Sequence, residues 1–334
     1  MQFDRPEFKK IKKYKRIGIL TSGGDAPGMN ASIRALVRYG IHHGIEIVGI
    51  KRGYSGILLR DFKNLQARSV ANIIQRGGTI LKSNRFPDWK KKSVRKKASQ
   101  ILKEHQIEAV IVIGGDGSLT GAYHFWKETG IPMIGLPGTI DNDIPGTDLT
   151  IGFDTAVNTG LEAIDRIRDT ANSHERIFLI EVMGRHSGHI AQEVGLAAGA
   201  ESIWIPESPI TSKEIIDRIK KAKEKGKLSS ILVIAEGSSG SQGRKIHQEL
   251  LKKGLEPRLC TLGHIQRGGS PSALDRNLAT LLSVTAIDAL LGGKTHHSIG
   301  TQKGTIVLTP LSRISRPSRS KAKDSFELTV KLAN

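Results

Sequence analysis

The feature that most constrains the fold of this 334-residue chain is a short pattern that occurs five times. In each copy, a run of four to six mainly apolar residues is followed at once by a polar segment rich in glycine. The runs are Ile17–Leu20, Val110–Ile113, Met133–Leu136, Ile177–Val182 and Ile231–Ala235. Such runs are typical of parallel strands that helices cover on both faces. Because ligands of these sheets bind beyond the carboxyl ends of the strands, we expect the polar segments to converge on one cleft.

The rest of the pattern fits the same architecture. Apolar residues at helical spacing follow Gly28, residues 45–50 predict another strand, and the glycines of residues 53–56 predict a turn. Residues 1–14 are basic, lack periodicity and are expected to form a loose N-terminal extension. The length suits two lobes. The predicted fold class is α/β, with two lobes that are each a largely parallel, Rossmann-like sheet flanked by helices and with an active site between them.

The chain has a formal net charge of +19 and one cysteine, Cys260. The charge comes from basic segments at Lys9–Arg16, Lys90–Lys97, Lys220–Lys227 and Arg313–Lys323. Such segments favour a polyanion or nucleic acid as partner, or else are solvated faces. No row of stacking aromatics or zinc-finger pattern accompanies them, so specific nucleic-acid binding is not expected. A lone cysteine excludes an intramolecular disulfide, and no apolar run could span a bilayer, which predicts a cytoplasmic protein.

The acidic turn at residues 136–146 is a candidate catalytic segment. Two prolines and two glycines hold this turn after a predicted buried strand, and Thr139, Asp141 and Asp143 project from it. Carboxylates crowded at a strand end repel one another unless a cation, a donor or a proton lies among them. The turn therefore suits a base and metal anchor for phosphate chemistry. The alternative is a polar loop whose aspartates cap backbone groups.

Two common phosphate-binding signatures are not complete in this chain. Gly23 and Gly28 have P-loop spacing, but Met29 and Asn30 replace the required Lys and Ser or Thr. The triplet Gly293-Lys294-Thr295 follows a predicted helix instead of a strand.

The glycines at positions 114, 115 and 117 predict a different phosphate cradle. They allow a triphosphate to approach the backbone, and the helix that follows directs its N-terminal amides at the anion. Asp116 within the cradle suits Mg²⁺, which prefers one or two carboxylates together with phosphate oxygens. An N-capping role for Asp116 is the alternative.

The second half of the chain supplies cations beside predicted strand ends and glycine turns. They are Arg176, Arg185, Arg258, His264 and Arg267. Arginine forks are a natural grip for a sugar phosphate, although each arginine alone could form a surface ion pair. His186 and His189 lack a cysteine or carboxylate partner in the sequence, so a helix-start role is favoured over a metal site.

Five motifs together resemble the bacterial ATP-dependent 6-phosphofructokinase family. They are Gly23–Asn30, Gly114–Ser118, Pro137–Asp143, Met183–Arg185 and Gly263–Pro271. The match runs in order from about Arg16 to Gly300. The resemblance implies that ATP phosphorylates the 1-hydroxyl of fructose 6-phosphate, giving fructose 1,6-bisphosphate and ADP, with Mg²⁺ as cofactor.

The resemblance also implies roles for individual residues. Asp141 matches the general base, with Thr139, Asp143, Arg85 and Arg185 as the other catalytic residues and Asp116 as the Mg²⁺ ligand. The matched ATP contacts are Gly24, Arg85, Phe86, Gly115, Asp116, Gly117 and Ser118. The matched sugar-phosphate contacts are Thr139, Ile140, Asp141, Arg176, Met183, Gly184, Arg185, Glu236, Arg258, His264, Ile265, Gln266 and Arg267. The 6-phosphate site of the family is shared between subunits, which implies a homotetramer.

The family divides into an ATP-binding lobe and a fructose 6-phosphate-binding lobe. By resemblance the first lobe takes residues 15–151 and 265–315, and the second takes 152–264 and 316–334. Effector positions for ADP and phosphoenolpyruvate match Arg34, Arg38, Arg168, Gly199, Glu201, Lys225 and Lys227. Asn72 and Leu228-Ser229 depart from the family pattern there, as does the basic tail from Thr301 onward.

Alternative functions remain open at this point. Pyrophosphate-dependent members carry an aspartate and a lysine where this chain has Gly117 and Gly138, and those side chains would occupy or recharge the space of the ATP α-phosphate. ATP is therefore the expected donor. An NAD or lipid kinase shares the glycine cradle but lacks the sugar-phosphate set of arginines. A basic nucleic-acid binder is the non-enzyme alternative.

Overall fold

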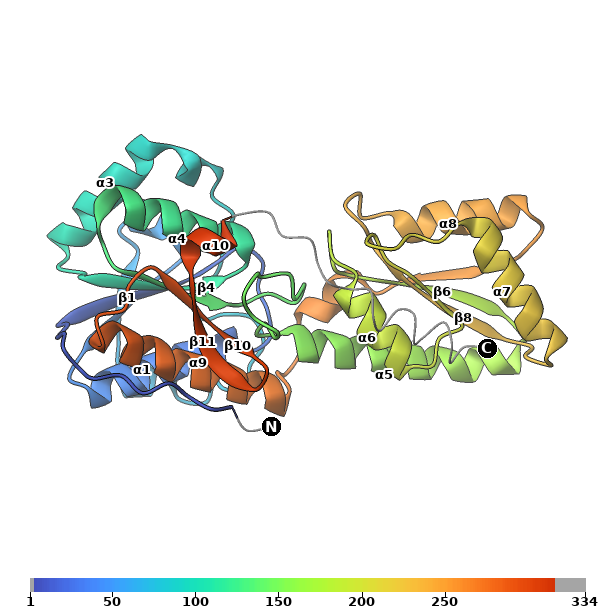
Figure 1. The fold of residues 1–334 in the computed structure, drawn as a ribbon, viewed down its shortest axis with the longest axis horizontal. Coiled ribbons are helices and arrows are strands. Elements are labelled where there is room, and N and C mark those ends of the chain that lie inside the picture. The colour runs from blue at the N-terminus through green and yellow to red at the C-terminus, as the bar shows by residue number, and fades with distance from the viewer. Residues whose placement is uncertain (1–2, 316–334) are drawn as a thin grey trace. The chain divides into compact units, whose positions relative to one another are not determined.

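The computed structural model describes residues 3–315, which divide into two compact units. The first unit comprises residues 3–139, 144–154 and 267–315, and the second comprises residues 140–143 and 155–266 (Figure 1). The chain therefore leaves the first unit, builds the second, and returns at Arg267. Part of the basic tail, residues 316–323, lies outside the described residues. Within residues 3–315, no helix has both the length and the apolar character that a membrane span requires.

The first unit is built on a seven-stranded sheet with the order β11-β10-β5-β4-β1-β2-β3. Its strands are β1 (Arg16–Ser22), β2 (Glu46–Ile50), β3 (Phe62–Leu65), β4 (Ala109–Gly114), β5 (Met133–Pro137), β10 (His297–Gln302) and β11 (Thr305–Pro310). The five inner strands are parallel, whereas β3 and β11 are antiparallel edges.

Helices cover both faces of this sheet, as the apolar runs predict. The helices are α1 (Met29–His42), α2 (Gly53–Leu58), α3 (Lys92–Glu104), α4 (Asp116–Thr129), α9 (Ala273–Leu291) and α10 (Leu311–Ile314). The described residues also contain the 3₁₀ turns η1 (Ala67–Val70) and η2 (Pro87–Lys90), and η3 (Gly263–Arg267) at the end of the second unit. In Figure 1, α3, α4 and α10 lie on one face of the sheet, and α1 and α9 lie on the other. Every residue of β4 is buried, because this strand is at the centre of the sheet with helices on both sides.

The second unit contains a parallel four-stranded sheet with the order β7-β8-β6-β9. Its strands are β6 (Ile177–Val182), β7 (Ser202–Trp204), β8 (Ser230–Ala235) and β9 (Arg258–Thr261). Its helices are α5 (Phe153–Ser173, which begins in the first unit), α6 (His189–Ala197), α7 (Ser212–Glu224) and α8 (Gln242–Lys252). Helices α7 and α8 pack with β6 and β8 around an apolar cluster that includes Leu179, Ile215, Leu232 and Ile246.

The register of the first sheet brings three strand ends into one row. Ser22 pairs with Gly114, and Gly114 pairs with Pro137, so β1, β4 and β5 end side by side. The chain continues from β1 to one side of the sheet and from β4 to the other. Such a switch point leaves a crevice at the carboxyl edge where ligands bind in α/β sheets.

The predicted turn at residues 53–56 is wrong, because these residues begin helix α2. The glycines serve the helix instead of a turn. Gly53 has a φ of 62°, and a Cβ on Gly56 would lie 1.7 Å from the Lys51 carbonyl oxygen. Close backbone packing therefore requires the glycine at position 56.

The N-terminal segment is not loose, in contrast to the expectation from its composition. Phe3 is buried, and Asp4 forms a β-bridge with Thr305. The amides of Ile11 and Lys12 both donate to the Leu291 carbonyl oxygen at 2.9 Å. These contacts come from residues that are distant in sequence, so local periodicity did not indicate them.

Candidate active site

The loop after β1 lies against two other predicted site segments of the first unit. The Ser83 hydroxyl donates to the Gly23 carbonyl oxygen at 2.6 Å, and the Gly23 amide donates to the Asn84 carbonyl oxygen at 3.4 Å. These bonds hold exposed Arg85 at the carboxyl edge of β1. A Cβ on Gly23 would lie 3.3 Å from Ser118 Oγ, so the first and second glycine segments are in contact.

The Gly114–Ser118 segment turns directly from β4 into α4. Gly115 is the N-cap, Asp116 is the first helical residue, and both Ser118 and Leu119 donate their amides to the Gly115 carbonyl oxygen at 3.0 Å. A Cβ on Gly114 would lie 2.5 Å from the Ser22 carbonyl oxygen, so β1 and β4 approach too closely for a side chain here. A Cβ on Gly117 meets no other described atom within 4 Å. The side-chain position of Gly117, in the first turn of α4, is therefore open, and the N-terminus of this helix suits an anion.

Two stacked aromatic residues, Tyr54 and Trp89, support the start of α4. The Tyr54 hydroxyl donates to the Ser118 carbonyl oxygen at 2.7 Å, and the ring of Tyr54 stacks on Trp89 with 4.1 Å between centroids. The Trp89 indole N–H donates to the Gly121 carbonyl oxygen at 3.3 Å. Complete burial raises the pKa of Tyr54, so its phenol remains a donor. Phe86, next to η2, packs against the apolar cluster that contains Tyr54 and Trp89.

The end of β5 places Thr139 beside the glycine cradle. A Cβ on Gly115 would lie 3.7 Å from Thr139 Cβ, and the Gly138 amide donates to the Gly114 carbonyl oxygen at 3.1 Å. The Thr139 carbonyl oxygen accepts from the Thr150 hydroxyl at 2.7 Å. Thr139 is therefore buried and fixed where the row of strand ends continues into the acidic turn.

Arg267 belongs to the first unit and lies against the β1 loop. Its Nη1 donates to the Asp25 carbonyl oxygen at 3.2 Å, and a Cβ on Gly24 would lie 2.6 Å from the same Nη1. Glycine at position 24 therefore leaves room for the guanidinium. The structure brings Arg267 next to predicted ATP contacts within this unit, whereas Arg176, Arg258 and His264 belong to the second unit.

Asp141 is buried at the start of the second unit, with 5% of its surface exposed. The Ser187 hydroxyl donates to the Asp141 carbonyl oxygen at 2.9 Å and accepts the His189 amide at 3.2 Å. Asn142, the next residue, has a φ of 50°. The acidic turn is thus held in a defined conformation by the N-terminus of α6. Sequence reasoning missed Ser187, because its role depends on a tertiary contact that no local motif reveals.

The second unit gathers another set of predicted residues at the carboxyl edge of its sheet. The Arg185 amide donates to Glu236 Oε1 at 3.0 Å, and the Met183 amide donates to Gln266 Oε1 at 2.8 Å. Gly184 has a φ of 147°, and a Cβ there would lie 2.3 Å from the Ser187 carbonyl oxygen. Arg185 itself has a φ of 52°. This turn after β6 is therefore strained and tightly specified, as functional turns often are.

Glu181 is a buried carboxylate at this edge that sequence reasoning did not single out. It accepts the Gly243 amide at 2.6 Å and the Thr261 hydroxyl at 3.2 Å. Burial raises the pKa of this carboxyl, although the two hydrogen bonds oppose the shift. Glu181 connects β6 to the start of α8 and the end of β9, so it positions the segments around Glu236 and His264.

The predicted phosphate-binding cations of the second unit do not form one cluster within a single chain. His264 follows β9 at the carboxyl edge, whereas Arg176 precedes β6 and Arg258 begins β9 at the opposite edge. Ile265 is 58% exposed in η3. Arg176 and Arg258 therefore do not share a sheet edge with His264.

Four predicted effector residues lie near one another in the second unit. Arg168 donates to the Ala198 carbonyl oxygen, next to Gly199, and Lys227 forms an ion pair with Glu201 at 3.6 Å. Glu201 also accepts the Ile231 amide at 2.7 Å. Lys225 follows α7 close by in sequence, whereas Arg34 and Arg38 lie on α1 of the first unit.

The donor set around Asp116 fits a cation that is held mainly by its substrate. Among residues 3–315, no group of three or more His, Cys, Asp or Glu side chains could hold a metal ion. Asp116 is one exposed carboxylate at a helix N-terminus beside the open space at Gly117. Mg²⁺ commonly uses one or two carboxylates, phosphate oxygens and water, so this arrangement suits it better than it suits zinc.

Comparisons with known proteins agree with this geometry. Residues 16–290 match the family model described as Phosphofructokinase. The chain is 46% identical over 319 residues to the ATP-dependent 6-phosphofructokinase of Thermotoga petrophila. This match covers 96% of this chain and 100% of that protein. It is 53% identical over 301 residues to ATP-dependent 6-phosphofructokinase 1 of Thermus thermophilus, covering 89% and 92% of the two chains.

The fold also resembles that of a solved phosphofructokinase structure. The structure of phosphofructokinase from Saccharomyces cerevisiae matches with a TM-score of 0.84 and 33% identity, covering 95% of this chain and 48% of that chain. This chain thus spans about half the length of the yeast chain. From the family match and the relatives, the chain belongs to the phosphofructokinase family.

Proposed function

We propose that this protein transfers the γ-phosphoryl group of ATP to the 1-hydroxyl of fructose 6-phosphate, giving fructose 1,6-bisphosphate and ADP, the committed step of glycolysis. The observation that carries the proposal is the row of strand ends at Ser22, Gly114 and Pro137. This row joins a glycine cradle and an open helix N-terminus to the acidic turn. Bacterial relatives that are 46% and 53% identical carry this activity in their names.

Asp141 is the proposed general base. Its carboxylate would accept the proton of the attacking hydroxyl, while Thr139 and Asp143 lie in the same turn. Because phosphoryl transfer requires positioning and charge stabilisation more than covalent catalysis, Arg85 and Arg185 are assigned to the charge on the transferring group. The fixed turn conformation around Asp141 supports this assignment.

Nucleotide binding is assigned to the first unit. Gly24, Arg85, Phe86, Gly115, Gly117 and Ser118 would contact ATP, and Asp116 would hold Mg²⁺. When bound, Mg²⁺ neutralises charge on the phosphate oxygens. The chain's own contribution is the open α4 N-terminus, which presents backbone amides to the phosphates.

ATP is the proposed donor instead of pyrophosphate. The open space at Gly117 leaves room for the part of a nucleotide beyond its β-phosphate, and an aspartate there would add a repelling charge. A Cβ on Gly138 would lie 2.9 Å from the Ile113 side chain, so this backbone favours glycine over lysine.

The sugar is assigned to the second unit. Ile140, Met183, Gly184 and Glu236 would contact fructose 6-phosphate, together with Ile265 and Gln266. Arg176 and Arg258 lie at the opposite sheet edge from His264, which supports a 6-phosphate site completed by a neighbouring copy, with Arg267 as a further contact. A homotetramer in the cytoplasm is part of the proposal.

Regulation by ADP and phosphoenolpyruvate is proposed at the effector positions that the resemblance implies. Arg168, Gly199, Glu201 and Lys227 lie near one another, which supports a common anion site. The other proposed effector contacts are Arg34, Arg38 and Lys225.

A single coupled assay tests the function. Fructose 6-phosphate is supplied with ATP or with pyrophosphate, each with and without Mg²⁺, and product formation is followed. We expect turnover only with ATP and Mg²⁺, and a change in the fructose 6-phosphate KM when ADP or phosphoenolpyruvate is added. Turnover with pyrophosphate alone, or none with either donor, would overturn the proposal.

A further inference from the structure

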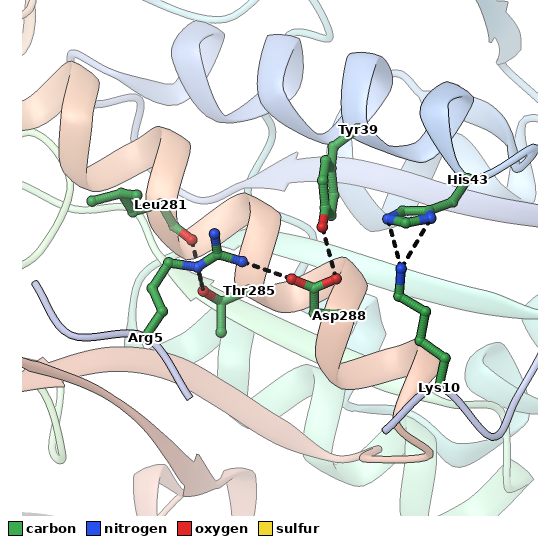
Figure 2. Close-up of polar contacts among 7 residues, drawn as sticks. All are labelled: Arg5, Lys10, Tyr39, His43, Leu281, Thr285 and Asp288. Atoms are coloured by element: carbon green, nitrogen blue, oxygen red, sulfur yellow. Dashed lines mark hydrogen bonds and ion pairs between the residues drawn. The ribbon is translucent and has the colours of Figure 1, made fainter. Parts of the chain in front are cut away.

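The N-terminal strap, defined as residues 3–15, lies outside the part of the chain that matches the family model. It has no regular secondary structure beyond its bridge at Asp4. Nevertheless, it is attached along its length to α9, β2 and β11 of the first unit, and to residues next to α1 and β4. Figure 2 shows two of its attachments, through Arg5 and Lys10.

The first half of the strap is held by Arg5. The guanidinium donates to Asp288 Oδ2 at 2.6 Å and to the Thr285 hydroxyl at 3.3 Å, both on α9 (Figure 2). The other oxygen of Asp288 accepts from the Tyr39 hydroxyl at 2.9 Å. Asp288 is therefore fully engaged in joining the strap to α1 and α9.

The second half is held mainly by its backbone. The Ile11 and Lys12 amides donate to the Leu291 carbonyl oxygen, and the Lys15 amide donates to Glu108 Oε2 at 2.6 Å. Lys10 Nζ lies 3.4 Å from the nearer ring nitrogen of His43. These bonds use backbone groups and one ammonium, so the side chains of the other strap lysines are not needed for attachment.

The strap lysines form a row of positive charge. Lys9, Lys10, Lys12, Lys13 and Lys15 are all exposed. Helix α1 and strands β10 and β11 contain no Asp or Glu. Within the strap, the two acids Asp4 and Glu7 both precede the lysines. On the adjoining elements, Asp288 already binds Arg5 and Glu46 binds Arg16 at 2.7 Å. Within residues 3–315, Lys9, Lys12 and Lys13 form no ion pair.

We propose that the strap is a binding surface for the phosphate backbone of nucleic acid, used without reading of base sequence. Seven residues from Lys9 to Lys15 span at most roughly 23 Å. Over that length a duplex strand carries about six or seven phosphates, at 3.4 Å each. Because the strap is already attached to the protein, binding does not have to order it, and little affinity is lost to entropy.

The residue types of the strap favour the phosphate backbone of nucleic acid over an anionic lipid bilayer. Lysine is a flexible point charge, and residues 9–15 contain no Arg, Asn or Gln to read base edges. Phe3 is buried, and Phe8 and Tyr14 are half-buried, so no fully exposed aromatic is available to insert into a bilayer. Ile11, which is 64% exposed, is the one large apolar side chain that the described strap presents to solvent.

The test uses the full-length protein and a fluorescent 20-base-pair duplex DNA of mixed sequence. Affinity is measured by anisotropy from 50 to 200 mM KCl for wild type and for the triple variant Lys9→Gln, Lys12→Gln and Lys13→Gln. The matched control replaces three exposed lysines of the second unit by glutamine, at positions 245, 252 and 253. Both triple variants lose the same charge, and phosphofructokinase assays of both should give the kcat and KM of wild type.

We expect wild type to bind DNA, and the strap variant to lower the slope of log affinity against log salt by about 2.7, or 0.9 for each lysine. The control variant should keep the wild-type slope. Equal slopes for the two variants would mean that binding follows net charge alone and would overturn the proposal. Strap-dependent capture by phosphatidylserine vesicles without DNA binding would identify a lipid surface instead and would also overturn it. The readout contains no substrate, so it does not depend on the proposed reaction.

Discussion

The Ser187 hydroxyl donates a 2.9 Å hydrogen bond to the carbonyl oxygen of Asp141. Ser187 is 2% exposed and also accepts the amide of His189, the first residue of α6. A single buried hydroxyl thus links the acidic turn to the start of a helix. The position of the proposed base therefore depends on a residue that does not touch the reaction itself.

Replacing Ser187 by alanine should lower the free energy of unfolding by about 1–3 kcal/mol, because the Asp141 carbonyl and His189 amide both lose a buried partner. Denaturant titration measures this loss. Ser173→Ala, at an exposed helical position, is the control and should change stability by less than about 0.5 kcal/mol. An equally stable Ser187→Ala protein would show that water or neighbouring groups replace the hydroxyl.

Asp141→Ser should fold normally but lose nearly all turnover. Removal of a general base typically costs about 10²–10⁴-fold in rate. Steady-state assays at saturating fructose 6-phosphate and ATP give kcat, and circular dichroism checks the fold. Asp217→Ser on the exposed face of α7 should retain wild-type kcat. Near-normal turnover of the Asp141 variant would contradict the assignment of the base.

Gly117→Asp should raise the KM for ATP by more than about tenfold, since a carboxylate at the α4 N-terminus repels the phosphates and competes for the backbone amides. The fold should tolerate the change, because the space beyond Gly117 is open. Gly117→Ala is the matched control and should alter the KM for ATP much less. A similar effect of both variants would indicate that flexibility of the glycine, and not charge, is important.

Protein stability should decrease as the pH falls below about 6.5, in part through His43. Burial lowers the pKa of this imidazole, with Lys10 and His42 adding to the shift. The unfolded histidine therefore binds its proton at a higher pH than the folded one, so acidification favours unfolding. The drop in Tm between pH 7.5 and 5.5 should be smaller for His43→Gln than for wild type.

The carboxyl ends of β1, β4, β5, β6 and β8 were predictable because these strands are apolar runs followed by polar, glycine-rich segments. β4 and β8 are buried at every residue, and the predicted site residues Gly115 and Glu236 follow them directly. The triplet Gly293-Lys294-Thr295 follows helix α9, as the sequence predicted, so it is not a P-loop. Gly293 lies next to Ile11 of the strap. The local sequence pattern was sufficient to predict a candidate site residue wherever that residue directly follows an apolar strand.

Other features depend on tertiary contacts and left no local signal. Gly56 reads as a turn residue in sequence, but it serves close packing of α2 against the Lys51 carbonyl. The strap appeared loose because its partners are distant in sequence; Asp288, for example, is 283 residues from Arg5. Glu181 was inconspicuous in a strand that otherwise appears apolar, although it connects three elements.

The two glycines that bear on the phosphoryl donor differ in how easily they can change. A side chain at Gly117 enters open space, whereas one at Gly138 meets Ile113 at 2.9 Å and Met29 at 3.2 Å. Natural variation could therefore alter position 117 in one step and keep a folded protein. A larger residue at position 138 would first require smaller or shifted neighbours in β4 and α1. An evolutionary route from one donor to the other would thus have a fixed order, with repacking of the core before exchange of the second glycine.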